Sequence, residues 1–211
     1  MHTLYFAPGA ASLVVHWMLI EADAPHQLVK LDLAAGEHKR PEYLALNPNG
    51  VVPTLVTDGV PAFESAALAL GIAEAHPAAG LAPPPSSPQR FAYYQWMLHL
   101  AHAVQPAFRT WFYPAEAAGE ACAEAAKDAA RAKIEAAWDR FEAHFADGRA
   151  WLLAGEGPTA PDFMLCMLMR WSRNMPRPAT AWPHLAAFAA RMKARPSFAT
   201  LYAREGLTEW A

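Results

Sequence analysis

The sequence predicts two domains of different classes, a small α/β domain followed by an all-helical one. Three observations lead to this prediction. Residues 1–77 alternate strand-like with helix-like segments, residues 78–88 have the composition of a linker, and residues 89–211 have helical apolar spacing. A chain of 211 residues is long enough for each domain to bury its own core.

The predicted elements of the first domain follow one another closely. Asp58-Gly59 is a strong two-residue hairpin signal, because both residues tolerate the backbone that such a turn requires. In chain order we expect a strand at 3–7, a helix at 11–21, a strand at 28–33, a helical turn at 41–46, strands at 54–57 and 61–63, and a helix at 64–74. A strand–helix–strand unit followed by a hairpin and a helix is the plan of thioredoxin-like domains.

Prolines and serines crowd the end of the linker, whose sequence AAGLAPPPSSP has no periodicity. A long amphipathic helix is expected from residue 88 to about residue 109. Pro106 should kink or end it, because proline removes a hydrogen bond of the helix interior. A second long helix is expected over 115–145.

The remainder of the helical domain begins with a capping signal. Thr159 stands at the N-cap, Pro161 in the first turn and Asp162 at the third helical position. The almost wholly apolar segment 163–171 that follows is expected to be the buried centre of the domain. Two shorter helices are expected to start at Pro183 and Pro196.

Charge and cysteine content limit the classes of function. A net charge of −3 provides no bulk attraction to nucleic acid or to an anionic membrane. Cys122 and Cys166 have no metal-ligand spacing, and the nine histidines form no zinc motif, so no metal is expected. The sequence shows no signal peptide and no apolar run of membrane-spanning length. We therefore expect a cytoplasmic protein with reduced cysteines.

The segment Asn-Pro-Asn-Gly-Val-Val-Pro-Thr-Leu at 47–55 combines a turn with a proline-containing strand. Pro53 cannot donate to a sheet ladder, so it belongs at the first residue of a strand, at an edge or at a bulge. If the Val52–Pro53 bond is cis, the Val52 backbone N–H and C=O turn outward and can pair with an extended peptide. An acid–hydroxyl pair, Glu64-Ser65, follows at a predicted helix start.

Five motifs, in order, resemble those of the bacterial cytosolic glutathione transferases. They are YFAPGAAS at 5–12, NPNGVVPTL at 47–55, FESAAL at 63–68, the capping-box segment at 155–162 and ARPSFATLYAREGL at 194–207. The resemblance covers nearly the whole chain and points to a beta-like or related class. It implies a thioredoxin-like glutathione-binding domain at 1–77 and an all-helical domain with an electrophile pocket at 89–211.

The resemblance also assigns glutathione-binding residues. Val52, beside Pro53, would bond the cysteinyl backbone as a short strand addition. The start of the helix at Glu64-Ser65 would hold the γ-glutamyl end, since a helix N-terminus favours a carboxylate. The segment containing His38 and Lys39 would meet the glycyl carboxylate. The full set is His38, Lys39, Val52, Pro53, Glu64 and Ser65.

Catalysis requires ionisation of the glutathione thiol, whose free pKa is about 8.5. Lowering that pKa by about two units needs differential stabilisation on the order of 2.7 kcal/mol. The Ser12 hydroxyl, at a helix start, is placed to donate to sulfur with help from the helix dipole. Tyr5 is the rival hydroxyl, although strand alternation should direct it away from this site. Ser12 alone would more often cap its helix than catalyse.

Three positions depart from the pattern of these relatives. Ala11 aligns with the beta-class cysteine and Gln105 with a helical histidine, so mixed-disulfide chemistry is not expected. Val51 replaces the usual lysine or glutamine before the Val-Pro pair. Ser12 is therefore left as the main candidate for thiol activation.

The resemblance places the electrophile pocket on the inner face of the first long helix. Its candidate residues are Ala11, His99, His102 and Trp111, although aromatic residues at helical spacing more often belong to a core or a dimer interface. We expect a homodimeric glutathione transferase with glutathione as cosubstrate and a hydrophobic or aromatic electrophile. The alternatives are a non-catalytic binding or regulatory protein of the same fold, and a specialised glutathione-dependent isomerase, dehalogenase or ether-cleaving enzyme.

Overall fold

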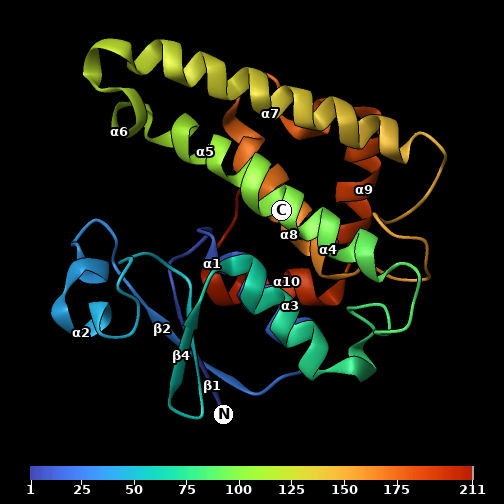
Figure 1. Cartoon of the computed structure of the whole chain (residues 1–211), viewed down its shortest axis with the longest axis horizontal. Coiled ribbons are helices and arrows are strands. Elements are labelled where there is room, and N and C mark those ends of the chain that lie inside the picture. Colours follow the sequence, from blue (N-terminus) through green and yellow to red (C-terminus); the bar gives the residue numbers. More distant parts are fainter. Residues whose placement is uncertain (211) are drawn as a thin grey trace. The chain divides into compact units, whose positions relative to one another are not determined.

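The computed structural model describes residues 1–210 and divides the chain into two compact units (Figure 1). The first unit combines Met1–Pro83 with the chain from Lys193 onward. The second consists of Pro84–Met192. The predicted division placed everything after residue 88 in the helical domain, whereas the structure groups the segment from Lys193 onward with the α/β unit.

The α/β unit contains a four-stranded mixed sheet in the order β2-β1-β3-β4. The strands are β1 (His2–Phe6), β2 (His26–Lys30), β3 (Thr54–Thr57) and β4 (Val60–Phe63), and the helices are α1 (Ser12–Glu21), α2 (Pro41–Leu44), α3 (Ser65–Ala75) and α10 (Pro196–Glu205). β1 pairs with β2 in parallel through the α1 crossover, and the other pairs are antiparallel. The predicted thioredoxin-like plan is confirmed.

Strand β2 starts two residues and ends three residues earlier than the apolar alternation predicted. Its register with β1 runs from His2↔His26 to Phe6↔Lys30. β1 ends at Phe6, and the bond from Leu31 N–H to Phe6 O, at 2.8 Å, is the last one β1 offers. The available partner, and not the apolar pattern, therefore sets where β2 ends.

The strand registers bring several segments to one end of the sheet. Lys30 pairs with Phe6, and Thr54 pairs with both Tyr5 and Phe63. The segments after β1, β2 and β4 therefore emerge beside the segment that precedes β3. These are the segments that contain Ser12, His38, Pro53 and Ser65.

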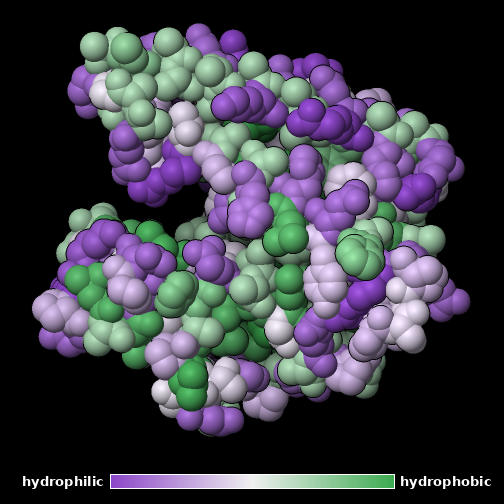
Figure 2. Space-filling model, in the orientation of Figure 1, coloured by the Kyte–Doolittle hydropathy of each residue, from purple (hydrophilic) through white to green (hydrophobic). Residues whose placement is uncertain are grey.

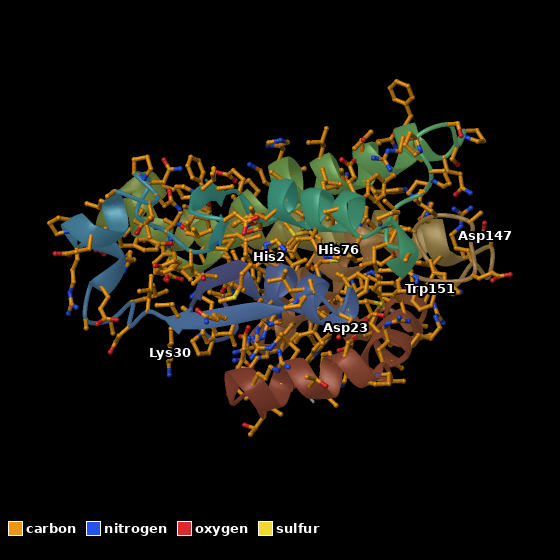
Figure 3. The ribbon with its side chains drawn as sticks, turned by 90° about the horizontal axis from the view of Figure 1, so that it is seen from below. His2, Asp23, Lys30, His76, Asp147 and Trp151 are labelled. Carbon is orange, nitrogen blue, oxygen red and sulfur yellow. The ribbon has the colours of Figure 1, made fainter. Side chains whose placement is uncertain are left out.

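The opposite end of the sheet is marked by two histidines. His2 of β1 and His76, which follows α3, lie close together (Figure 3), with ring centroids 6.2 Å apart. His2 Nδ1 also lies 2.8 Å from the Thr57 hydroxyl. Burial lowers the pKa of His2, and the nearby N-terminal charge lowers it further.

Helix α10 belongs to the α/β unit because it packs against α1. The indole N–H of Trp17 donates to Ser197 Oγ at 2.8 Å, and the Trp17 ring lies 5.3 Å from that of Phe198. Arg195 forms an ion pair with Glu21 at the end of α1. These contacts join segments that are far apart in the sequence: Trp17 and Ser197 are separated by 180 residues. Local sequence pattern carries no signal of such a pairing.

The helical unit contains two long helical stretches, both interrupted. Its elements are α4 (Arg90–His99), a π-helical segment (Leu100–Val104), α5 (Gln105–Phe112), α6 (Pro114–Ala118), α7 (Ala123–Phe145), α8 (Ala160–Trp171) and α9 (Pro183–Lys193). The α-helix of the first stretch ends at His99, and in the π-helical segment the Gln105 N–H bonds to Leu100 O, five residues back. Pro106 follows in the first turn of α5, so the expected interruption lies just before the proline and α-helix resumes with it. The second stretch breaks at Gly119, whose φ of 72° and ψ of 164° no α-helix accommodates.

Helix α8 is the buried centre of the helical unit, as predicted, and its capping box is confirmed. The Asp162 carboxylate accepts bonds from the Thr159 N–H and from the Leu152 N–H, each at 2.8 Å. Burial raises the pKa of Asp162 to about 6 despite these donors. The box has a structural role, because it satisfies donors at a helix start inside the core.

Helix α7 presents a different surface. Charged side chains such as Lys127 and Arg131 alternate with alanines along it, and Figure 2 shows this mixture of hydrophilic and apolar residues. Across residues 1–210, none of the helices has the length and apolar character needed to cross a membrane.

Candidate functional site

The loop between β1 and α1 is held by Ser12, the first residue of α1. The Ser12 hydroxyl donates to Ala7 O at 3.1 Å and accepts from the Ala7 N–H at 3.2 Å. The side chain is 0 % exposed. In this arrangement the hydroxyl proton of Ser12 points at Ala7 O, so Ser12 fixes the turn that leads into the helix and does not point its hydroxyl at solvent.

A second clamp on the same loop comes from α10. Glu205 Oε2 accepts from the Gly9 N–H, and Glu205 Oε1 accepts from His16 Nδ1, both at 2.8 Å. The side chains of His16 and Glu205 are both 0 % exposed. The His16 ring also packs against Phe6, at 5.9 Å between centroids. The start of α1 is therefore held from inside by Ser12 and from the terminal helix by Glu205.

The Val52–Pro53 peptide bond is cis, as the sequence allowed. Just before it, Gly50 has a φ of +56°, and a Cβ at this position would lie 2.9 Å from His38 O. Only glycine fits this close approach. The side chain of Lys39 donates to Gly50 O at 2.7 Å, which ties the 37–39 segment to the loop before Val52.

The carbonyl of Val51 is held by two side chains that the sequence did not mark as functional. The Tyr43 hydroxyl donates to Val51 O at 2.6 Å, and Asn47 Nδ2 donates to the same oxygen at 2.8 Å. Tyr43 is 4 % exposed and Asn47 0 %. The turn signal at 47–50 predicts a loop, but nothing in it indicates which atoms hold the loop in place.

Glu64 and Ser65 lie at the start of α3, at the same end of the sheet. Glu64 is the N-cap residue, with a φ of 76°, which is uncommon outside glycine. Its side chain is exposed, whereas Ser65 is buried as the first residue of the helix. The first N–H groups of a helix have no acceptor within it, so this terminus can receive a carboxylate.

The remaining glutathione candidates occupy a short 3₁₀ turn, Glu37–Lys39. His38 is half-buried in it, and Lys39 uses its amino group on the Gly50 carbonyl. Arg40, the next residue, pairs with Glu37 at 3.1 Å. The turn therefore holds one acidic and one basic side chain, with Arg40 beside it, at the end of the sheet where Val52 and Ser65 lie.

The electrophile candidates divide between the two units. Ala11, half-buried, immediately precedes α1. His99, His102 and Trp111 belong to the helical unit, in α4, in the π-helical segment and in α5. His99 packs against the Phe141 ring at 5.9 Å, and its pKa is lowered, chiefly by burial. The Lys127 amino group lies 4.9 Å from the Trp111 ring, so α7 covers one face of this indole.

Three features lie at this end of the sheet: the cis Val52–Pro53 bond, the start of α3 at Ser65 and the turn at Glu37–Lys39. Within residues 1–210, no cluster of three or more histidine, cysteine or acidic side chains is arranged to hold a metal ion.

Family models match both units of the chain. The Glutathione S-transferase, N-terminal domain, matches residues 2–74, and the Glutathione S-transferase, C-terminal domain, matches residues 124–191. Glutathione S-transferase GST-4.5 of Xanthomonas campestris pv. campestris is 32% identical over 205 residues, covering 97% of this chain and 98% of that protein. The chain belongs to the glutathione S-transferase family.

Solved structures of the family agree with this membership. The glutathione S-transferase from Xylella fastidiosa has a TM-score of 0.89 at 30% identity and covers 99% of this chain and 100% of its own. A glutathione transferase homolog from Sulfitobacter, solved with bound glutathione, has a TM-score of 0.88 at 29% identity and covers 99% of both chains. The predicted family, fold class and enzyme class are confirmed, with glutathione as the family's cosubstrate.

Proposed function

We propose that the protein conjugates the glutathione thiol to a hydrophobic or aromatic electrophile. One observation carries the proposal: the cis Val52–Pro53 segment and the Glu64-Ser65 helix start lie at the same end of a thioredoxin-like sheet in a chain of this family. The exposed rings of Phe112 and Tyr113 at the end of α5 support an apolar, aromatic cosubstrate. No metal takes part in this proposal.

Each part of glutathione has a proposed partner. The Val52 N–H and C=O pair with the cysteinyl backbone beside Pro53. Ser65 and the start of α3 receive the γ-glutamyl carboxylate, and the exposed Glu64 carboxylate accepts from its amino group. His38 and Lys39 provide positive charge toward the glycyl carboxylate, with Lys39 also holding Gly50.

The chemical step needs a thiolate at the start of α1. The glutathione S–H loses its proton to solvent, and the sulfur attacks the electrophilic carbon. A new S–C bond forms while the leaving group departs with its electron pair. We propose that Ser12 acts from this helix start, holding the Ala7–Ser12 turn so that backbone N–H groups and the helix dipole stabilise the thiolate.

Binding of the γ-glutamyl end gives the first prediction. Ser65→Ala should weaken glutathione binding about ten- to a hundred-fold, because a hydrogen bond to a charged group contributes about 1.5–3 kcal/mol. Isothermal titration calorimetry with glutathione measures this effect. The dipeptide Cys-Gly, which lacks the γ-glutamyl group, is the matched ligand and should bind both proteins equally. A wild-type protein that takes up no glutathione at millimolar concentration would contradict the proposed function.

A second candidate is a glutathione-binding protein without turnover. Two observations favour this candidate. Ala11 and Gln105 replace reactive residues of the beta class, and the Ser12 hydroxyl is hydrogen-bonded to Ala7. A panel of aryl halides, alkyl halides, aryl ethers and isomerisable double bonds separates the candidates. Conjugates formed from aryl halides support the transferase, reaction confined to another class indicates a specialised enzyme, and binding without any product indicates the non-catalytic protein.

The expected homodimer is also a proposal. Phe91 of α4 is 89 % exposed, and a large exposed ring is a frequent feature of interfaces. Light scattering coupled to size-exclusion chromatography should give a mass of about twice that of one chain, and a monomeric mass at micromolar concentration would contradict the proposal. The cytoplasmic location, like the homodimer, stays a prediction.

A further inference from the structure

The Val51 carbonyl oxygen has both of its acceptor positions filled by buried side chains. Tyr43 donates its hydroxyl proton at 2.6 Å, and Asn47 Nδ2 donates at 2.8 Å. The Asn47 side-chain oxygen in turn accepts from the Asn49 N–H at 3.1 Å. This peptide carbonyl is therefore fixed by α2 and by the turn that follows it.

A third hydroxyl stands behind Tyr43. The oxygen atoms of Tyr43 and Thr54 lie 2.8 Å apart, and Thr54 is 0 % exposed. A phenol has one hydroxyl proton, and Tyr43 uses it in the hydrogen bond that it donates to Val51 O. The Thr54 hydroxyl must therefore be the donor in its bond with the Tyr43 oxygen. The bonds run in one direction, from Thr54 through Tyr43 to Val51, and each polarises the next. Burial raises the pKa of Tyr43, which keeps the phenol protonated across the neutral range.

The orientation of the Val51 carbonyl decides that of the Val52 N–H. Both belong to one planar trans peptide, in which the C=O and the N–H point in opposite directions. Because Tyr43 and Asn47 hold the carbonyl inward, the Val52 N–H faces away from them. That N–H is the donor assigned to the cysteinyl backbone of glutathione. The bonds from Tyr43 and Asn47 to the Val51 carbonyl therefore affect binding through a rigid peptide plane.

We propose that Tyr43 is a positioning residue for glutathione: its phenol, supported by Thr54, fixes the Val51–Val52 peptide plane and so presents the Val52 N–H to the tripeptide. This inference rests on the proposed function, because it deepens the role of the same segment. Tyr43 is 4 % exposed and acts through Val51, so it is not assigned a contact with the substrate.

The test compares four single variants with the wild type. Tyr43→Phe removes the donor and keeps the ring, and Thr54→Val removes the supporting hydroxyl with little change of shape. Thr54→Ser restores that hydroxyl. Tyr94→Phe is the matched control, because its hydroxyl accepts from Arg90 Nε at 2.9 Å in the helical unit. Each protein is assayed for glutathione Kd, both KM values, kcat and Tm.

Tyr43→Phe should raise the Kd and KM for glutathione roughly five- to ten-fold, as expected for one lost hydrogen bond. The kcat at saturating glutathione and the KM for the electrophile should not change, because Tyr43 touches neither the thiol nor the cosubstrate. Thr54→Val should shift the same two constants by less, and Thr54→Ser should return them to wild type. Tyr94→Phe should leave every kinetic constant unchanged.

Other results overturn the assignment. A lower Tm with unchanged glutathione affinity means that Tyr43 is only structural, and a fall in kcat without a rise in KM means that it acts elsewhere. If Tyr43→Phe fails to fold, the Thr54→Val and Thr54→Ser pair decides, since an equal Kd for the two removes the positioning role. A wild-type protein that binds no glutathione contradicts the proposed function itself, which separates that failure from this one.

Discussion

Ser12→Ala should reduce turnover ten-fold or more while glutathione binding stays nearly intact. The substitution removes both bonds between the hydroxyl and Ala7 and leaves a buried backbone N–H and C=O without that partner. The turn into α1 then loses its fixed geometry, and the helix start stabilises the thiolate less well. A ten-fold loss corresponds to about 1.4 kcal/mol of transition-state stabilisation.

The measurement is kcat with saturating glutathione, together with the pKa of the bound thiol from its thiolate absorbance. Ser172→Ala is the matched control. Ser172 is also 0 % exposed, donates to Met169 O at 2.6 Å and accepts from the Ala179 N–H at 2.8 Å, but it lies in the helical unit. Both variants should lose similar stability, about 1–3 kcal/mol, and only Ser12→Ala should raise the thiol pKa. Unchanged turnover in Ser12→Ala would remove this residue from the mechanism.

Glu205→Ala should lower the free energy of unfolding by about 2–6 kcal/mol, because two buried or half-buried donors lose their acceptor and each such loss costs about 1–3 kcal/mol. His16 and Gly9 each lose the acceptor that Glu205 provides at 2.8 Å. Because Gly9 lies in the half-buried part of the loop before α1, whereas Ser12 is fully buried, the glutathione KM should rise as well. Urea denaturation measures the free energy of unfolding, and steady-state kinetics measure the glutathione KM.

Glu142→Ala is the control for Glu205. Glu142 accepts from His184 Nδ1 at 2.7 Å and from the backbone N–H groups of His184 and Leu185, so it offers the same kinds of bonds in the other unit. It is partly exposed, so its loss should cost less stability, and it should not affect the glutathione KM. Equal effects of the two substitutions on KM would argue against a specific role of Glu205 in the loop.

Short-range signals were sufficient for much of the fold. The hairpin at Asp58-Gly59, the capping box at Thr159 and the helix starts at Pro183 and Pro196 all have their causes within a few residues, and the structure confirms them. The exact end of β2 and the place of α10 depend on partners elsewhere in the chain. No pattern along the sequence states which strand or helix will pair with which, so these two features could not be read locally.

The candidate site divides in the same way. The cis Val52–Pro53 bond and the Glu64-Ser65 helix start stand in short motifs, so the sequence indicates them. Tyr43 and Glu205 were missed because each acts on a backbone group that only folding brings near it. The sequence suggested that Ser12 matters, but the direction in which its hydroxyl points depends on the bond to Ala7.

Glu205 reaches Gly9 across 196 residues of sequence, and the whole helical unit lies between the two segments of the α/β unit. The α/β unit is therefore discontinuous, with residues 84–192 inserted into it. A chain growing on the ribosome has its complete helical unit before residue 205 exists, because synthesis proceeds from the N-terminus. The helical unit can finish folding first, while the loop that begins α1 acquires its second clamp only after α10 has been made. The start of α1, at the end of the sheet where the cis Val52–Pro53 bond lies, is thus among the last parts of the protein to be completed.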